Sequence, residues 1–378
     1  MSTKSTILQI LSSSKGGAAV SGEELAQQCG VSRAAVWKAV NALREEGFEI
    51  TGTTNGGYVL DSSDVLTTEA VSLAFNAGFP QFVGARIECF KEIDSTNIQA
   101  KRWLSECGSL RTADGELTPA GKNYSNAVIV AEKQTAGRGR SGRTFVSPAR
   151  TGIYLTVIYA PQGGITDPAK ITAFSAVAVC RAIKKLYDIQ PSIKWINDIF
   201  YNGKKICGIL TEGTTNFETG IIEAAVIGIG VNIEDNAEAF GGELSKVAGG
   251  LLGGTGAREG GTGTKGGDTT TKAGDTRPTG TPSSHSVTRA QLAAQIAGET
   301  LQVLSEPADQ VIAEYKDLSF IIGREVEVHT LIDSAQGIYK ATAVDIDQNA
   351  ALVVQLPDGT RRRLISGEVS LKSESFTG

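Results

Sequence analysis

Residues 131–148, AEKQTAGRGRSGRTFVSP, concentrate arginine and glycine in a chain whose formal net charge is −5 at pH 7. Glycine lets the backbone approach a ligand closely and adopt positive φ angles. Arginine presents a planar fork of donors that matches phosphates and carboxylates. The stretch therefore predicts a loop that wraps an anion. A solvated basic loop and a loop that binds RNA through its arginines are the alternatives.

The composition is that of a soluble globular protein with two or three domains. The chain has 378 residues, of which 40% are hydrophobic and 20% charged. The N-terminus is a poor signal peptide, and no apolar run approaches the roughly 18 residues of a membrane span. We therefore expect a cytoplasmic protein with no membrane partner. Five widely spaced cysteines and two histidines make a disulfide framework, a zinc site and a histidine-based triad poor candidates.

Residues 1–63 have the pattern of a winged helix-turn-helix. SGEELAQQCG is a short helix that ends at Gly30, and a second helix begins after an N-cap at Ser32. FEITGTTNGGYVL is a hairpin wing, turned at Asn55 and Gly56. In a DNA-binding domain of this kind, the second helix enters the major groove. The side chains on its outer face are Ser32, Arg33, Trp37, Lys38 and Asn41.

The charge of this region leaves an alternative open. Residues 1–60 carry five basic and five acidic side chains, so the electrostatic footprint of a DNA-binding protein is weak. A small helical docking module has the same pattern. If the domain does bind DNA, specific binding is expected to need a dimer.

Residues 66–320 alternate buried strands with amphipathic helices. NAVIVAEK, GIYLTVIYA and IIEAAVIGIGVN are strands, and KITAFSAVAVCRAIKKLYD is a helix with one apolar face. PSIKWINDIFYNGKKICGILTE is a hairpin in which Asn202 and Gly203 suit a type I′ turn. The region is predicted to be a mixed α/β domain, within a chain of the α+β class.

Two further segments complete the predicted organisation. Residues 248–284 are dominated by Gly, Thr, Lys and Asp, so we expect a flexible insertion without a site. Residues 321–378 contain short strands, two of them separated by the turn signal Asp358-Gly359. This small β barrel is near the lower size limit for a stable domain and is expected to pack on the central region.

Three polar segments are candidates to join the arginine-rich loop at one site. DSTN, at residues 94–97, precedes a helix, and on its own it favours helix capping over ligand binding. KWINDIFYNGKKICGIL sets four polar side chains among apolar residues: Lys194, Asn197, Asp198 and Lys205. These side chains suit phosphate and magnesium binding, and an ordinary hairpin with charged edges is the alternative. IGIGVN allows close approach of a ligand, but the chain lacks the Rossmann and P-loop glycine patterns.

The order DSTN, GRGRSGR, KWIND, KICGIL, GIGVN resembles the biotin–protein ligase family. The winged N-terminus resembles the bifunctional branch of that family, in which the ligase is also the biotin operon repressor. The resemblance covers almost the whole chain except residues 248–284. It implies a class II synthetase-like central domain and an SH3-like C-terminal barrel.

The resemblance also implies an activity, with biotin, ATP and Mg²⁺ as ligands. Biotin is activated to biotinyl-5′-AMP, and biotin is then transferred to a lysine of a biotin carboxyl carrier protein. The adenylate-bound protein forms a homodimer that binds operator DNA and represses biotin genes. A lipoate ligase, which shares the fold, and a biotin-responsive DNA-binding sensor without ligase activity are the alternatives.

The resemblance assigns roles to individual residues. The biotin pocket is lined by Ser95, Thr96, Asn97 and Gln134. The loop residues that close over the ligand are Arg138, Gly139 and Arg140. Catalysis needs positive charge on a pentavalent phosphate, which is expected from Arg138, Arg140 and Lys205. A closing loop also shields the anhydride from water.

The region expected to bind ATP departs from the family pattern at two positions. Asn197 and Asp198 are expected to serve ATP and its metal, with Asp198 as the metal ligand. Ile196 stands where the family has proline, and Phe145, near the adenine, stands where it has tryptophan. We expect modest changes in ATP affinity from these two departures.

Overall fold

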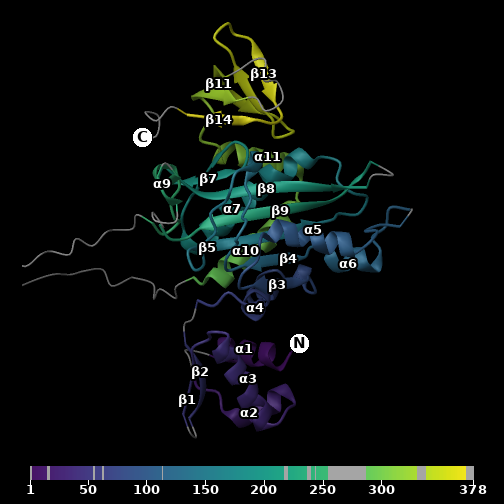
Figure 1. Cartoon of the computed structure of the whole chain (residues 1–378), viewed down its shortest axis with the longest axis vertical. Coiled ribbons are helices and arrows are strands. Elements are labelled where there is room, and N and C mark those ends of the chain that lie inside the picture. Colours follow the sequence, from purple (N-terminus) through teal and green to yellow (C-terminus); the bar gives the residue numbers. More distant parts are fainter. Residues whose placement is uncertain are drawn as a thin grey trace, which may run out of the picture.

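The computed structural model describes residues 2–14, 18–53, 56–61, 64–112, 114–216, 220–235, 240–242, 244–253, 287–329 and 338–371. Asn55 and most of the insertion expected at 248–284 lie outside these ranges. None of the helices among the described residues combines the length and apolar composition needed to span a membrane. Figure 1 shows a large sheet across the middle of the molecule, with a helical N-terminal unit at one end and a small β unit at the other.

The N-terminal unit is a winged helix-turn-helix, as predicted. Ser21 and Ser32 each cap a helix by accepting a hydrogen bond from the backbone N–H three residues later, at 3.0 and 3.2 Å. Gly30 ends the first of these helices in the left-handed conformation, with φ 64°. The wing strands pair antiparallel. The elements are α1 (Thr3–Ser13), α2 (Gly22–Cys29), α3 (Arg33–Glu45), β1 (Ile50–Thr53) and β2 (Gly57–Leu60).

The described residues of the central region form a seven-stranded sheet in the order β3-β4-β5-β9-β8-β7-β6. Only the β3–β4 pair is parallel in this sheet as described. Asn202 and Gly203, with φ 47° and 72°, form the predicted turn between β7 and β8. The strands are β3 (Ile87–Phe90), β4 (Val128–Ala131), β5 (Gly152–Tyr159), β6 (Ser192–Lys194), β7 (Asp198–Tyr201), β8 (Lys204–Thr215) and β9 (Ile222–Asn232).

Helices cover both faces of this sheet. Val128 and Val130 of β4 belong to the larger core, under α4 (Thr68–Gly78), α7 (Pro168–Tyr187), α10 (Arg289–Val303) and α11 (Ala308–Leu318). Ile129, between them, belongs to a second core with α5 (Thr96–Glu106) and α6 (Pro119–Tyr124). Because successive side chains of a strand point to opposite faces, a strand covered on both sides is apolar throughout. The short helices are η2 (Pro80–Phe82), η3 (Arg140–Gly142) and α9 (Leu244–Val247).

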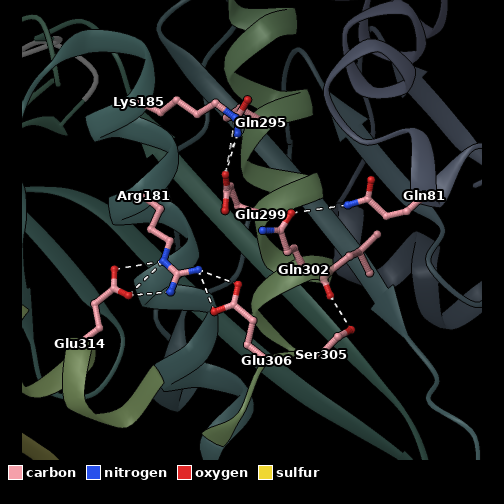
Figure 2. Close-up of polar contacts among 10 residues, drawn as sticks. Gln81, Arg181, Lys185, Gln295, Glu299, Gln302, Ser305, Glu306 and Glu314 are labelled. Atoms are coloured by element: carbon pink, nitrogen blue, oxygen red, sulfur yellow. Dashed lines mark hydrogen bonds and ion pairs between the residues drawn. The ribbon is translucent and has the colours of Figure 1, made fainter. Parts of the chain in front are cut away.

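A polar cluster joins the helices of the larger core, away from the cavity described below (Figure 2). Arg181 of α7 donates to both carboxylate oxygens of Glu306 and of Glu314, at 2.6 to 3.1 Å. The two carboxylates raise the pKa of Arg181, mainly through the hydrogen bond to Glu314. In the same layer, Gln295 donates to Glu299 within α10 at 2.8 Å. Arg181 thus ties α7 to α11 and to the segment that connects α10 with α11.

A buried arginine joins the interdomain linker to the end of β4. The Arg289 side chain, only 8% exposed, pairs with Asp64 of the linker at 2.6 Å and with Glu132 at 2.5 Å. Glu132 also accepts a hydrogen bond at 2.7 Å from the backbone N–H of Arg150, where the arginine-rich loop ends. The linker, the N-terminus of α10 and both ends of that loop are thus connected by one ionic cluster.

The C-terminal unit is a small antiparallel β barrel that packs on the central region, as predicted. Its described strands run in the order β13-β12-β11-β10-β14. Trp195 in the turn after β6 donates from Nε1 to the Ala350 carbonyl of the barrel at 2.9 Å. The barrel interior is continuous with the larger core of the central region. The strands are β10 (Glu325–His329), β11 (Ile338–Ile346), β12 (Leu352–Gln355), β13 (Arg361–Leu364) and β14 (Glu368–Ser370).

Candidate active site

One cavity of about 510 Å³ is lined by all the residues to which the resemblance assigned a role toward biotin or ATP. It lies over the sheet between the N-terminus of α5, the arginine-rich loop and the β6–β7 turn. The predicted residues that line it are Ser95, Thr96, Asn97, Gln134, Arg138, Gly139, Arg140, Phe145, Asn197, Asp198 and Lys205. Residues from four separated segments of the sequence therefore meet at one site.

Two rows of residues across neighbouring strands form the floor of this cavity. In the first row, Gly228 of β9 pairs with Thr156 of β5 and Leu210 of β8. A Cβ atom at Gly228 would lie 2.3 Å from Asn97 Oδ1. In the second row, a Cβ at Gly230 would lie 2.4 Å from the Phe145 ring. The glycines of IGIGVN, expected to admit a ligand, make room for these two side chains in this structure.

The sequence of DSTN, taken alone, predicted a side-chain cap for α5, but the structure has no such cap. Ser95 stands at the N-cap, but its side chain makes no capping hydrogen bond. Gln134 instead accepts hydrogen bonds from the Thr96 backbone N–H at 2.9 Å and the Thr96 hydroxyl at 3.2 Å. The Gln134 side chain, 38 residues away in the sequence, thus accepts the hydrogen bond of a backbone N–H that has no partner within the helix. Within the described residues, the buried Ser95 hydroxyl makes no hydrogen bond of its own.

The arginine-rich loop is a tight turn that its glycines make possible. The Gly139 N–H donates to the Arg143 carbonyl at 2.7 Å, and the Phe145 N–H donates to the Gly137 carbonyl at 2.9 Å. A Cβ atom at Gly137 would lie 2.3 Å from the Phe145 carbonyl oxygen. Only glycine fits at that position without moving the loop.

Arg138 and Arg140, two of the arginines that line the cavity, differ in their contacts. Arg140 donates to Asn197 Oδ1 at 2.9 Å and to the Gly367 carbonyl of the C-terminal barrel at 3.0 Å. Arg138 is exposed, and its guanidinium has no hydrogen bond or ion pair within the described residues. The Arg138 guanidinium is therefore available to an anionic ligand, whereas Arg140 ties the loop to the β6–β7 turn and the barrel.

The opposite wall of the cavity carries an ion pair between neighbouring strands. Lys205 Nζ of β8 lies 2.7 Å from Asp198 Oδ1 of β7. Asn197 donates to the Ile209 carbonyl at 2.9 Å, so both ends of its amide are held. The Trp195–Ile196 peptide bond in this turn is cis. The Tyr315 hydroxyl donates to the Ile196 carbonyl at 3.1 Å, which anchors the turn to α11.

The donor set of the cavity suits a magnesium ion shared with a nucleotide. Among the described residues that line the cavity, Asp198 is the one acidic side chain. No group of three or more His, Cys, Asp or Glu side chains that could hold a metal occurs in the described ranges. Magnesium is commonly bound by one or two carboxylates together with substrate phosphates. The Asp198 carboxylate is the protein group at the cavity that would serve as such a ligand.

Sequence reasoning missed Glu212, Thr156 and Lys101, which hold the Asn97 amide in place. Asn97 donates to Glu212 at 2.9 Å and accepts from the Thr156 hydroxyl at 2.7 Å, and Lys101 pairs with Glu212 at 2.6 Å. Period-2 alternation along β8 could have found Glu212, because it shares a face with Gly208 and Leu210 of the cavity floor. No local pattern indicated Thr156 or Gly367.

The helix proposed to contact DNA presents the predicted residues at the surface. Arg33, Trp37 and Lys38 are exposed on α3, and Trp37 is 60% exposed despite its size. Asn41, partly exposed, accepts a hydrogen bond from Arg44 at 3.1 Å. Ser32 is exposed but uses its hydroxyl as the helix cap. A large exposed aromatic ring between two cations suits a contact surface better than a solvated helix face.

Three family models match the chain in the order of its structural units. They are an HTH domain at residues 3–59, the biotin/lipoate A/B protein ligase family at 109–232, and the biotin protein ligase C terminal domain at 321–372. The biotin protein ligase from Aquifex aeolicus in complex with biotin and ATP has a similar fold. Its TM-score is 0.52 with 19% identity, over 75% of this chain and 97% of that one.

Sequence relatives cover most of both chains. The bifunctional ligase/repressor BirA of Bacillus spizizenii is 32% identical over 248 residues, 66% of this chain and 70% of the relative. The corresponding protein of Bacillus subtilis is 31% identical over 249 residues, with the same coverage. The bifunctional ligase/repressor BirA of Escherichia coli is 30% identical over 213 residues, 56% of this chain and 59% of the relative. The chain therefore belongs to the biotin/lipoate A/B protein ligase family, with a helix-turn-helix domain at its N-terminus.

Proposed function

We propose that the protein activates biotin with ATP, transfers biotin to a lysine of a biotin carboxyl carrier protein, and represses biotin genes when adenylate-bound. The observation that carries the enzymatic part is the cavity, whose lining combines buried polar side chains with several cations, among them Arg138 and Lys205. The buried polar side chains suit the head group of biotin, and the cations suit its carboxylate and a nucleotide phosphate.

Biotin binds at the end of the cavity formed by α5 and Gln134. The buried hydroxyls of Ser95 and Thr96 and the amide of Asn97 offer hydrogen bonds to the fused ureido ring. The valeryl chain runs along the apolar strand residues, and the carboxylate reaches toward Arg138 and Lys205. This orientation places the reacting oxygen beside the cations.

Activation forms a bond between a biotin carboxylate oxygen and the α-phosphorus of ATP. The bond from that phosphorus to the bridging oxygen breaks, and pyrophosphate leaves. Negative charge grows on the phosphoryl oxygens in the transition state, where Arg138 and Lys205 stabilise it electrostatically. Lys205 can leave Asp198 for the phosphate because both sit at the cavity surface.

The nucleotide occupies the side of the cavity lined by Asn197, Asp198 and Phe145. Asp198 and the phosphates would hold a magnesium ion, which when bound neutralises phosphate charge. Phe145 offers a ring face to the adenine. Arg140 acts by positioning, since its bonds to Asn197 and Gly367 hold the loop against the turn and the barrel.

Transfer needs an acceptor lysine whose amine reaches the mixed anhydride. The amine nitrogen bonds to the acyl carbon, the carbon–oxygen bond to AMP breaks, and the amine loses a proton. The arginine-rich loop excludes water from the anhydride until the acceptor arrives.

The regulatory part rests on α3 and its exposed Arg33, Trp37 and Lys38. The helix enters the major groove of operator DNA, with Ser32 and Asn41 completing the contact face. Because residues 1–60 carry no excess of basic over acidic side chains, one copy binds DNA weakly. Adenylate-linked homodimerisation doubles the contacts and makes binding depend on biotin.

The test of the enzymatic part is detection of the acyl-adenylate by mass spectrometry after incubation of the full chain with ATP and either biotin or lipoate. Biotinyl-5′-AMP is the expected product. Lipoyl-AMP alone would identify a lipoate ligase instead. Tight binding of biotin without any adenylate would leave a DNA-binding sensor that has lost catalysis.

A further inference from the structure

The amide of Asn97 is surrounded by groups that leave it one orientation. Its Nδ2 lies 2.9 Å from Glu212 Oε2 and 3.3 Å from the Leu210 carbonyl oxygen. Its Oδ1 lies 2.7 Å from the Thr156 hydroxyl. Asn97 and Thr156 are buried, with 4% and 0% of their surfaces exposed. The three contacts come from β8 and β5, on either side of β9.

The chemistry of these partners decides which end of the amide is oxygen. An ionised carboxylate and a backbone carbonyl only accept hydrogen bonds, so both N–H groups of the Asn97 amide must point at Glu212 and Leu210. The Thr156 hydroxyl then donates to Oδ1. The amide has no N–H left for a ligand, and the second lone pair of Oδ1 is its remaining hydrogen-bonding capacity.

The surroundings of Glu212 favour its ionised form, which accepts the hydrogen bond from Asn97. Burial by itself raises the pKa of the Glu212 carboxyl, but hydrogen bonds from Lys101 and Asn97 outweigh it and lower the pKa below its usual value. The charges of Lys101 and Arg138 act in the same direction. Lys101 Nζ lies 2.6 Å from Oε1, the oxygen that Asn97 does not use.

We propose that Glu212 and Thr156 are positioning residues that hold the Asn97 oxygen toward the cavity as an acceptor for an N–H group of the ligand. This inference rests on the proposed function and deepens it. A cyclic urea carries N–H donors beside its carbonyl, whereas a dithiolane ring carries none. A buried acceptor left without a donor disfavours the wrong ligand. The Glu212–Asn97–Thr156 set therefore selects biotin over lipoate.

The direct test replaces Glu212 by glutamine. Lys101 donates, so it claims the single oxygen of the new amide and turns its NH₂ group toward Asn97 Nδ2. Two donors then face each other, and the Asn97 amide flips. We expect Glu212→Gln to weaken biotin binding about tenfold, measured by calorimetry without ATP. Its KM for biotin rises equally, while kcat and the KM for ATP stay within about twofold.

A second substitution is expected to reverse the effect. In Lys101→Met/Glu212→Gln, no cation competes for the glutamine oxygen, so that oxygen can again accept from Asn97 and biotin affinity returns. Thr156→Val loses affinity in the same way, and Thr156→Ser keeps it. Glu92→Gln is the matched control, because Glu92 forms an exposed ion pair with Lys133 at 2.8 Å, away from the cavity.

Three outcomes would overturn the inference. Unchanged biotin affinity in both Glu212→Gln and Thr156→Val would show that the amide orientation does not matter. A joint fall in kcat, ATP affinity and melting temperature, without rescue by Lys101→Met, would show a purely structural role. Absence of biotin binding by the unmodified chain would overturn the proposed function as well, and is distinguishable because the first two outcomes require a working parent protein.

Discussion

Arg138 and Arg140 are two positions apart in the sequence but differ in what they touch. Arg138 is exposed at the cavity, and its guanidinium makes no hydrogen bond or ion pair among the described residues, whereas Arg140 bonds to Asn197 and to Gly367 of the barrel. Neighbouring arginines of one motif thus have different roles, Arg138 toward the ligand and Arg140 within the loop. Sequence reasoning assigned both to catalysis.

Alanine substitutions separate these roles. Arg138→Ala and Lys205→Ala are each expected to lower the rate of adenylate formation about 100- to 1000-fold, because each removes charge from the phosphoryl transition state. Arg140→Ala is expected to lower it only about tenfold and to increase release of hydrolysed adenylate, since the loop loses its anchor. Single-turnover assays that quantify biotinyl-AMP and AMP measure both effects. Equal losses in Arg138→Ala and Arg140→Ala would contradict the division of roles.

The Glu212 carboxylate also makes stability depend on pH. Its pKa in the folded protein lies below the ordinary value of 4.5, so its ionised form stabilises the fold. That contribution is complete above about pH 4.5 and is lost as the pH falls through the lower, folded-state pKa. We expect the difference in unfolding free energy between the parent and Glu212→Gln to be constant at neutral pH and to shrink in acid. A difference that grows on acidification has the wrong sign for this account.

At the scale of elements, the Arg289 cluster connects α10, β4 and the linker that carries the winged domain. Arg289 lies in the interior while Asp64 is 50% exposed, so the pair with Glu132 carries most of the buried charge. Removing the guanidinium leaves the largely buried Glu132 carboxylate without its ion pair, with the Arg150 backbone N–H still donating to it. Such a loss is costlier than breaking a surface ion pair.

Arg289→Met is expected to destabilise the central domain by about 3 kcal/mol. Lys133→Met, next to Glu132 in the sequence but in an exposed pair with Glu92, is expected to cost at most about 1 kcal/mol. Chemical denaturation followed by tryptophan fluorescence measures both, since Trp103 and Trp195 are buried in this domain. Similar losses for the two variants would mean that the Arg289 cluster contributes no more than a surface pair.

Helix α3 has an element-scale test of its own. Arg33→Ala and Lys38→Ala are expected to weaken DNA binding and to reduce the slope of log affinity against log salt by about 0.9 per lost phosphate contact. Biotin activation should stay at the parent level, because α3 lies outside the cavity. Fluorescence anisotropy at several salt concentrations gives the slope. An unchanged slope would favour a docking module over a DNA-binding helix.

For the whole molecule, local signals predicted the elements and distant contacts completed the site. Ser32 begins α3 and Gly30 ends α2 as expected, because capping depends on adjacent backbone groups. Asn202 and Gly203 form a turn as expected, because both residues adopt positive φ. The hydrogen bonds from Thr96 to Gln134 and from Arg140 to the Gly367 carbonyl could not be predicted. These contacts depend on how strands and domains pack, which no short pattern encodes.

The same limit explains why the sequence pointed to residues that line the cavity but not to the residues that hold them in place. The motif residues lie near turns and helix ends, where polar side chains stand out from apolar strands. Thr156 and Glu212 lie within strands, where a polar residue is ordinarily assigned to the surface. Strand register pairs Gly228 with Thr156 on one side and with Leu210 on the other, which brings both residues close to the Asn97 side chain.

The most direct measurement of the central claim is biotin-dependent exchange of labelled pyrophosphate into ATP by the full chain. Exchange requires reversible formation of the adenylate and needs neither a carrier protein nor DNA. The account predicts strong exchange with biotin, little with lipoate, and collapse of the biotin signal in Lys205→Ala. Absence of exchange at saturating biotin and ATP, or exchange that survives in Lys205→Ala, would contradict it.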